Sequence, residues 1–301
     1  MRLDLFLAHQ VPGCSRRTAH RAIAAGAVRI NGRRARKGDH VSADDRLQIT
    51  EELYAPPVLQ PNPHLALRVL YEDDAVIIVD KPAGMPSHAL RAHESDTVAN
   101  FLLARDPDLA QIANGDREAG LVHRLDTDTS GILLAARTTA AHRALRQQFA
   151  RHQVLKEYLV LVEGRVAAPG VVRTPIAHDR HNRRKMRVSL RPTPATREAV
   201  THFRPIDPQG NRTLLVVRIP TGVTHQIRVH LASIGHPIVG DRLYGSATQV
   251  ARRQLLHAAK LCFAHPTTGE PMQISSPLPT DFVTVLNRRK RAPCGRARLI
   301  L

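Results

Sequence analysis

The chain contains the polar stretch His123-Arg124-Leu125-Asp126-Thr127-Asp128-Thr129-Ser130-Gly131, followed directly by the apolar run Ile132-Leu133-Leu134-Ala135-Ala136. A continuous apolar run beside a glycine predicts a buried strand. The polar residues before it then form a loop anchored to a rigid sheet. Carboxylates, an arginine and hydroxyls on such a loop are suited to site chemistry. The alternative interpretation is a solvated turn whose Asp and Thr side chains bind backbone groups.

The distribution of charge predicts a polyanionic partner. The 301 residues carry a formal net charge of +18, from 44 Lys and Arg against 26 Asp and Glu. Residues 1–50 hold ten basic and four acidic residues, and residues 180–197 and 288–298 hold seven and six basic residues with no acidic one. Basic segments on a nearly neutral body are typical of proteins that bind polyanions. Charge alone leaves RNA, DNA and anionic membrane open, and an aromatic content of 3% argues against many stacked bases.

Composition also argues against several classes of protein. No run of 18 apolar residues is present, so we expect no membrane span, and the N-terminus lacks the layout of a signal peptide. Cys14, Cys262 and Cys294 are widely spaced, which argues against a disulfide framework or zinc site and predicts a reducing, cytoplasmic location. The 17 histidines are scattered, and His225 and His230 lack metalloprotease spacing. We therefore expect no metal.

Residues 1–50 are expected to form a small α/β module. Leu3, Phe6 and Leu7 predict a short helix, and Ser15 is a candidate N-cap for a second helix that ends near Ala25. Strands are expected at 28–30, near Val41 and at 47–49, with Asn31-Gly32 as a tight turn. An exposed basic helix beside a basic hairpin can follow phosphates. The candidate RNA contacts here are Arg16, Arg17, Arg21 and Arg29.

The remaining chain divides into a linker, a large domain and a tail. Prolines in residues 51–66 predict a semi-rigid linker. A second domain is expected over residues 67–287, and a basic, disordered extension over 288–301. Residues 173–200 are expected to be irregular, with Arg180 to Arg187 as a mobile loop along which RNA backbone runs; a purely solvated loop is the alternative. The candidate contacts there are Arg183, Arg184 and Lys185.

Within the second domain, hydrophobic periodicity predicts several further elements. Strands are expected at 69–71, 75–79, 154–162 and 216–219, and a helix capped by Thr138 or Thr139 runs to about Arg151. Period-two alternation places Lys156 and Tyr158 on one strand face. Lys81 ends a strand, where a lysine is usually solvated, so it is assigned no catalytic role.

A last helix is expected from a Thr224 cap to Gly235. Ile227, Leu231 and Ile234 would form its buried stripe, which leaves Arg228 off that stripe near the helix start. A positive charge gains nothing from the dipole there, and a nearby anion would compensate it. A surface arginine is the alternative interpretation.

Two stretches resemble known families. The order His123-Arg124-Leu125-Asp126, with Thr129-Ser130-Gly131, resembles the signature of RNA pseudouridine synthases of the RluA/RluD type, and the resemblance is nearly continuous from 67 to about 286. Residues 1–50 resemble an S4 RNA-binding domain, through Arg2-Leu3-Asp4 with Phe6-Leu7, Ser15-Arg16, Gly26-Ala27-Val28-Arg29-Ile30-Asn31-Gly32 and Gly38-Asp39. The implied fold class is α+β: an S4-like domain plus a catalytic domain on a mixed, largely antiparallel sheet flanked by helices.

The resemblance also implies roles for individual residues. Asp126 matches the catalytic nucleophile, Tyr158 matches the tyrosine of a Lys-x-Tyr pair in the active site, and Arg228 matches an arginine that pairs with the aspartate. Arg124 matches the residue that fills the stack vacated by a flipped base. Val223 departs from the family, which commonly has Arg there, and this weakens any phosphate contact at that place.

The implied activity is isomerisation of uridine to pseudouridine in RNA, without a cofactor. An S4-like domain beside this core resembles the enzymes of large-subunit (23S) ribosomal RNA more than the tRNA-directed ones. Covalent catalysis through Asp126 is expected, at either uracil C6 or ribose C1′. The alternatives are a tRNA pseudouridine synthase, a non-catalytic RNA-binding protein on this scaffold, and a DNA- or membrane-binding protein using the same charge. We expect a monomer with RNA as its partner, no protein partner and no membrane association.

Overall fold

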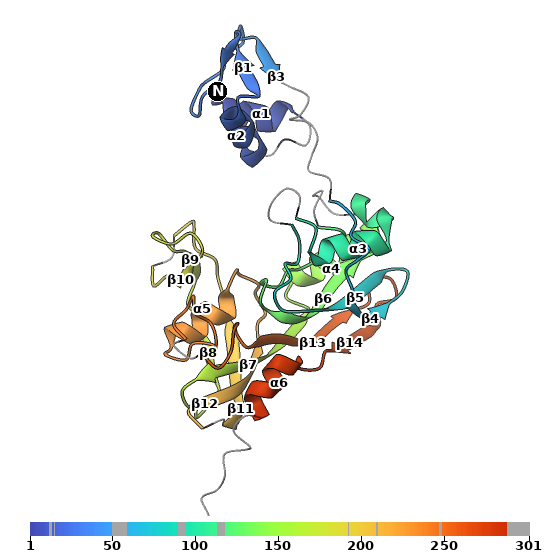
Figure 1. Ribbon diagram of the computed structural model, residues 1–301, viewed down its shortest axis with the longest axis vertical. Helices are drawn as coiled ribbons and strands as arrows, with labels where there is room; N and C mark the ends of the chain where they lie inside the picture. The colour runs from blue at the N-terminus through green and yellow to red at the C-terminus, as the bar shows by residue number, and fades with distance from the viewer. Residues whose placement is uncertain are drawn as a thin grey trace, which may run out of the picture. The chain divides into compact units, whose positions relative to one another are not determined.

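The computed structural model describes residues 1–11, 14, 16–49, 59–89, 94–112, 118–191, 193–208, 210–246 and 249–287. The chain divides into two compact units, Met1–Val58 and Leu59–Leu301 (Figure 1). Residues 59–66, which the sequence analysis assigned to the linker, belong to the second unit: Leu59 is buried in its core, and Asn62 N–H donates to Asn100 O. The expected tail at 288–301 and the expected cap Ser15 lie outside the described residues.

The first unit packs two helices on a small antiparallel sheet. Its elements are α1 (Leu3–Gln10), α2 (Arg16–Ala25), β1 (Val28–Ile30), β2 (Arg33–Arg34) and β3 (Leu47–Ile49), with strand order β2-β1-β3. The two predicted helices and the strands at 28–30 and 47–49 are confirmed. Asn31 and Gly32 both have positive φ, 50° and 80°, as a two-residue hairpin turn requires. Val41 is buried but lies outside any strand, so that expectation was wrong.

The second unit is built on a nine-stranded mixed sheet. The strand order is β4-β5-β6-β13-β7-β12-β11-β8, with β14 paired to β13. Among the described strands, only β6 and β13 pair in parallel; the other pairs are antiparallel. The strands are β4 (Arg68–Glu72), β5 (Val76–Lys81), β6 (Ser130–Ala136), β7 (Leu155–Glu163), β8 (Gly170–Val172), β11 (Thr201–Pro208), β12 (Arg212–Arg218), β13 (Leu256–Ala264) and β14 (Pro271–Ser275). The predicted largely antiparallel α+β architecture is confirmed.

Helices cover both faces of this sheet. One face packs against α3 (Val98–Arg105) and α5 (Gln226–Ser233), and the other packs against α4 (Thr139–Ala150) and α6 (Thr280–Asn287). Strand β7 shows the alternation that divides the two cores. Tyr158, Val160 and Val162 lie in the core with α3 and α5, and Leu161 lies in the core with α6. The predicted shared face of Tyr158 is therefore that of the α5 core.

A glycine fixes the beginning of β6. Gly131 has φ 111°, and a Cβ atom there would lie 2.2 Å from the Ala258 carbonyl oxygen on β13. Only a residue without a side chain permits this close approach of two backbones. The apolar run from Ile132 to Ala136 is buried along its whole length, as predicted. The polar stretch therefore ends on the parallel junction at the centre of the sheet.

Residues 173–200 contain an ordered hairpin, which corrects the expectation of an irregular, mobile segment. Strands β9 (Ile176–His178) and β10 (Met186–Val188) pair antiparallel. In the turn between them, Asp179 Oδ1 accepts hydrogen bonds from two backbone N–H groups, those of His181 and Asn182. Such side-chain acceptors stabilise turns.

Helix α5 is packed on two sides, by the sheet and by this hairpin. Ile227 and Leu231 face the sheet core, and Val229 packs with Met186 of β10. The expected stripe was therefore partly wrong, because Ile234 is exposed, and Arg228 is buried. Helix α5 ends at Ser233, close to the predicted end at Gly235.

The beginning of α5 also differs from the prediction. The N-cap residue is His225, not Thr224. The buried side chain of Gln226 holds the loop before the helix, because its Oε1 accepts hydrogen bonds from Val223 N–H and from the Thr221 hydroxyl. In the described part of the chain, no helix is long and apolar enough to cross a bilayer.

Candidate functional site

A cleft of about 1210 Å³ lies where the polar stretch, β7 and the beginning of α5 meet. Four of the predicted site residues line it together: Arg124, Asp126, Tyr158 and Arg228. Arg184 from the β9–β10 hairpin lines it as well. The cleft exceeds the roughly 300–1,000 Å³ of a typical small-molecule pocket. It has the size and the residues of a site for a large polar substrate.

At the cleft floor, Asp126 and Arg228 form an ion pair. Arg228 Nη1 donates to Asp126 Oδ2 over 2.9 Å. The same guanidinium binds Asp241 in a bidentate manner, through Nε to Oδ2 at 2.7 Å and Nη2 to Oδ1 at 3.0 Å. The side chain of Asp126 is 24% exposed, whereas that of Asp241 is 1% exposed. One buried cation thus lies between a sealed carboxylate and a carboxylate that reaches the cleft.

The burial of Arg228 excludes the alternative interpretation of a surface arginine, and Asp126 is the nearby anion that was expected. Burial disfavours its charge, but the hydrogen bonds and charge of Asp241 outweigh this, with a smaller contribution from Asp126, and they raise the pKa of Arg228 above its usual value. Its guanidinium also lies 5.2 Å from the centre of the Tyr244 ring, within cation–π range. Sequence reasoning expected an anion near Arg228 but did not identify Asp241 or Tyr244.

Lys81 ties the loop after β5 to the polar stretch, and it is fully buried rather than solvated as expected. Its ammonium group donates to three carbonyl oxygens, those of Pro82, Met85 and Thr127, at 3.0, 2.7 and 2.8 Å. Burial lowers the pKa of Lys81 to about 7, against the opposing charges of nearby carboxylates. The position of Lys81 at the end of a strand does not predict its burial, because the carbonyl oxygens that accept its hydrogen bonds come from loops.

Two further contacts hold the polar stretch. Ser87 Oγ donates to Leu125 O at 2.9 Å and accepts from Leu125 N–H at 3.0 Å. His123 Nε2 accepts a hydrogen bond from Leu134 N–H at 3.1 Å, and its ring stacks on Phe149 at 5.1 Å. Burial, followed by the charge of Lys156, lowers the pKa of His123 to about 3, so the ring is neutral. Asp126 therefore projects from a loop that is held on both sides.

Tyr158 faces the cleft from β7 and is 7% exposed. Burial raises the pKa of its hydroxyl, and the charge of Asp126 raises it further. The phenol is therefore protonated at neutral pH. A protonated hydroxyl beside a carboxylate can donate a hydrogen bond to a polar substrate group.

The remaining predicted RNA contacts lie on exposed surfaces. Arg124 is exposed at the cleft, where its Nη1 lies 3.4 Å from His88 Nε2. On the hairpin, Arg183 and Arg184 are exposed and Lys185 is half-buried. In the first unit, Arg16, Arg21 and Arg29 are exposed, whereas the side chain of Arg17 lies outside what the structure describes.

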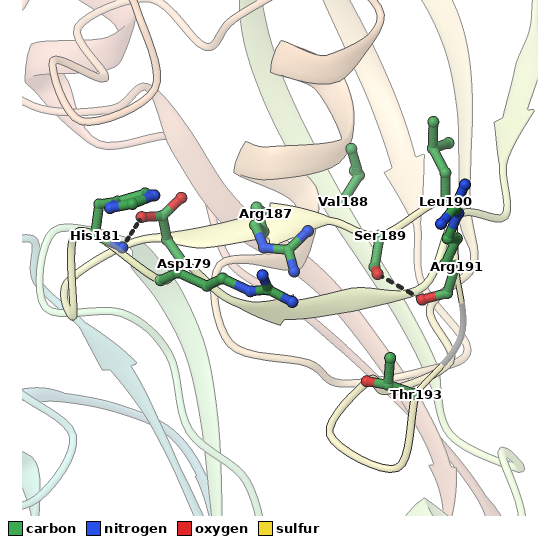
Figure 2. A pocket seen from close by; sticks show the side chains of 9 residues that line it. Asp179, His181, Arg187, Val188, Ser189, Leu190, Arg191 and Thr193 are labelled. Carbon is green, nitrogen blue, oxygen red and sulfur yellow. Dashed lines mark hydrogen bonds between the residues drawn. The ribbon is translucent and has the colours of Figure 1, made fainter.

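The hairpin carries a second, shallower basic pocket of about 650 Å³ (Figure 2). Arg187 lies in the middle of this pocket, between Asp179 and His181 at one end and Arg191 at the other, and Leu190, 89% exposed, lies beside Arg191. Within the described residues, no group of three or more His, Cys, Asp or Glu side chains could hold a metal ion.

Comparisons with known proteins agree with this fold. The family described as RNA pseudouridylate synthase matches residues 75–233, and the S4 domain family matches residues 1–47. The chain is 37% identical to ribosomal large subunit pseudouridine synthase D of Xanthomonas campestris, over 99% of this chain and 92% of that protein. It is 41% identical to an uncharacterised RNA pseudouridine synthase of Chloroflexus aurantiacus, over 95% of this chain and 89% of that protein.

A solved structure agrees with these sequence matches. Human RNA pseudouridylate synthase domain containing 1 superposes with a TM-score of 0.57 at 25% identity, covering 72% of this chain and 86% of that one. The chain belongs to the RNA pseudouridylate synthase family. It is an RNA pseudouridine synthase with an N-terminal S4 domain, as the sequence predicted.

Proposed function

We propose that this enzyme converts specific uridines of large-subunit ribosomal RNA to pseudouridine, with Asp126 as the nucleophile that attacks a flipped-out uridine. The ribosomal substrate is supported by the names of similar proteins from Xanthomonas campestris and Xylella fastidiosa, both ribosomal large subunit pseudouridine synthase D. A tRNA substrate is the alternative. We expect the enzyme to act in the cytoplasm as a monomer without a cofactor.

The Asp126–Arg228 pair at the floor of the cleft carries this proposal. A nucleophilic carboxylate must be ionised, oriented and open to its substrate. Arg228 orients the carboxylate through a charge-assisted hydrogen bond to Oδ2. In the described part of the chain no hydrogen bond reaches Oδ1, so this oxygen is available to form a bond to carbon.

The reaction exchanges one glycosidic bond for another. The N1–C1′ bond breaks, the C5–C1′ bond forms, C5 loses a proton and N1 gains one, so no electron acceptor is needed. Asp126 would bond transiently to uracil C6 or ribose C1′ and leave again, which divides one difficult step into two. Tyr158, protonated in the resting enzyme, would donate a hydrogen bond to the flipped base and begin any proton transfer from its O–H form.

Access to the base requires extrusion of the nucleotide from its stack, at a cost of a few kcal/mol. Arg124 is exposed, two residues before Asp126, and would fill the vacated space. RNA phosphates would contact Arg183, Arg184 and Lys185 of the hairpin and Arg16, Arg17, Arg21 and Arg29 of the S4 unit.

Val223, where the family commonly has Arg, lines the cleft and packs against the apolar cluster beneath the hairpin. Residue 223 therefore makes no charged contact with RNA in this enzyme. Arg184 lines the same cleft and would supply positive charge there.

The substrate is tested by mapping pseudouridines in ribosomal RNA and tRNA from cells with and without the gene. The proposal predicts that sites disappear from large-subunit RNA and return when the wild-type gene is restored. Purified enzyme should form the same sites on a large-subunit transcript. Loss of tRNA sites with an unchanged ribosomal RNA pattern would instead establish the tRNA alternative.

A further inference from the structure

Tyr244 links the β9–β10 hairpin to a histidine beside Asp126. The backbone N–H of Met186 on β10 donates to the Tyr244 hydroxyl oxygen over 2.8 Å. That hydroxyl lies 2.9 Å from His225 Nδ1. We assign the hydroxyl proton to Nδ1, because Met186 already donates to the hydroxyl oxygen and this assignment leaves an N–H on the ring nitrogen that faces Asp126. Because Nδ1 accepts, the neutral imidazole carries its proton on Nε2.

The Nε2–H group of His225 is directed to the proposed nucleophile. His225 Nε2 lies 4.0 Å from Asp126 Oδ2, the same oxygen that receives Arg228 Nη1. The distance is longer than a hydrogen bond, as is common in catalytic sites before the substrate binds. The Arg228 guanidinium and the His225 N–H group thus both face Oδ2 of Asp126, which leaves Oδ1 for reaction.

The backbone of His225 adopts a conformation that side-chain-bearing residues rarely take. It has φ 55° and ψ 18°, in the left-handed region, and its side chain makes no helix-capping hydrogen bond. Gly or Asn would occupy this position with less strain. Backbone strain of this kind persists mainly where it places a functional group. Here it places the imidazole between Tyr244 and Asp126.

We propose that His225 is a positioning residue for Asp126: when RNA binds, its Nε2–H closes on Oδ2, and Tyr244 fixes the tautomer required for this. The inference rests on the proposed role of Asp126 as nucleophile. The inference also gives Tyr244 a role. Its hydroxyl accepts a hydrogen bond from Met186 and donates one to His225 Nδ1, which holds the imidazole in the tautomer with its proton on Nε2. The hairpin that would bind RNA is thereby connected to the His225 imidazole through two hydrogen bonds, and the closing Nε2–H to Oδ2 contact would extend this connection to the carboxylate.

The charges around His225 agree with a neutral ring. Burial is the main cause that lowers the pKa of His225. Asp126 and Asp241 favour its protonation, whereas Arg228 and His178 oppose it. A proton added to Nδ1 would face the Tyr244 O–H proton, so the charged ring would lose that hydrogen bond and would form a tight ion pair with Asp126.

The test compares His225→Leu, His225→Gln and Tyr244→Phe in single-turnover assays with a substrate transcript. His225→Leu should lower the rate about tenfold to hundredfold, as expected for a lost hydrogen bond to a charged group, without changing RNA affinity. His225→Gln should recover most of the rate, because its amide N–H reaches the place of Nε2. Tyr244→Phe should have an intermediate rate. The control is His202→Gln, an exposed histidine on β11, which should match wild type.

The pH profile separates positioning from packing. In wild type the rate should fall as the pH drops through the lowered pKa of His225, and this part of the profile should be missing in His225→Gln. A wild-type rate in His225→Leu would overturn the inference, as would equal losses in the Leu and Gln variants with an unchanged profile. If His225→Leu does not fold, the rates and pH profiles of His225→Gln and Tyr244→Phe still test the inference. Full activity of Asp126→Asn would instead refute the underlying proposed function.

Discussion

Arg228 Nη1 lies 2.9 Å from Asp126 Oδ2, although 102 residues separate them in the sequence. Because Asp241 binds the same guanidinium from its other side, Arg228 keeps a carboxylate partner throughout a catalytic cycle. In the proposed mechanism Asp126 would lose its charge on bonding to carbon, and Asp241 would then leave no buried cation uncompensated. This arrangement would permit the carboxylate to enter and leave a covalent state without disrupting the fold.

Replacement of Arg228 by lysine should reduce both activity and stability. One ammonium cannot reproduce the bidentate contact with Asp241 and also reach Asp126. The nearly sealed Asp241 would lose much of its compensation, at a cost of about 3 kcal/mol. Urea denaturation measures this loss. Arg218→Lys is the matched control, since Arg218 pairs with Glu157 while 60% exposed, and its effect should stay below about 1 kcal/mol. Equal stability of the two variants would contradict this assignment.

Replacement of Tyr158 by phenylalanine should slow the reaction while leaving the protein folded. The change removes one hydroxyl from the cleft and keeps the ring in the α5 core. A loss of about 10²-fold or more in the single-turnover rate is expected for a group in proton transfer. Tyr71→Phe serves as control, because its hydroxyl bonds Asp73 outside the cleft. Product formation at the wild-type rate by Tyr158→Phe would exclude the proposed role.

Lys81 should make stability depend on pH. Its pKa is lowered to about 7 in the folded protein, against 10.5 when unperturbed. Between these values the unfolded chain binds more protons than the folded one, so stability should rise with pH, by up to about 1.4 kcal/mol per unit. Lys81→Met should be less stable, because three carbonyl oxygens lose their donor, and should show a flatter dependence. Parallel curves for the two proteins from pH 7 to 9 would disprove this.

The elements predicted correctly from the sequence are those with local signals. Helix α4 begins at a Thr138 side chain that caps the Ala141 N–H, and Ala141 and Leu145 form its buried stripe. The β9–β10 hairpin was missed because its many basic residues resemble a solvated loop. Its pairing depends on Asp179 and on packing against α5, which are tertiary features.

The same distinction applies to the site. Asp126, Tyr158 and Arg228 were selected through a motif resemblance, and the structure brings them to one cleft. The burial of Arg228 and Lys81, and the partners that compensate their charges, could not be predicted, because charged residues are usually exposed. A buried charge becomes favourable only where distant segments supply acceptors, such as Asp241 or the Thr127 carbonyl. A single sequence contains no local pattern for these pairings.

The hairpin should contribute charge to RNA binding. Arg184→Gln should weaken binding and lower the slope of log affinity against log salt by about 0.7 to 0.9, the value for one phosphate contact. Titrations of substrate RNA at several salt concentrations measure this slope. Arg68→Gln is the matched control, because Arg68 is also exposed but lies on β4, an edge strand of the nine-stranded sheet, and does not line the cleft. Identical slopes for both variants would place the RNA elsewhere.

The central claim, that the Asp126 carboxylate performs the chemistry, is tested most directly by tritium release from RNA labelled at uracil C5. Asp126→Asn keeps the size of the side chain but removes the nucleophile, and Asp128→Asn changes the exposed carboxylate two residues later in the same loop. The account predicts wild-type RNA affinity for both variants, no tritium release by Asp126→Asn, and release near the wild-type rate by Asp128→Asn. Release by Asp126→Asn at the wild-type rate would contradict it.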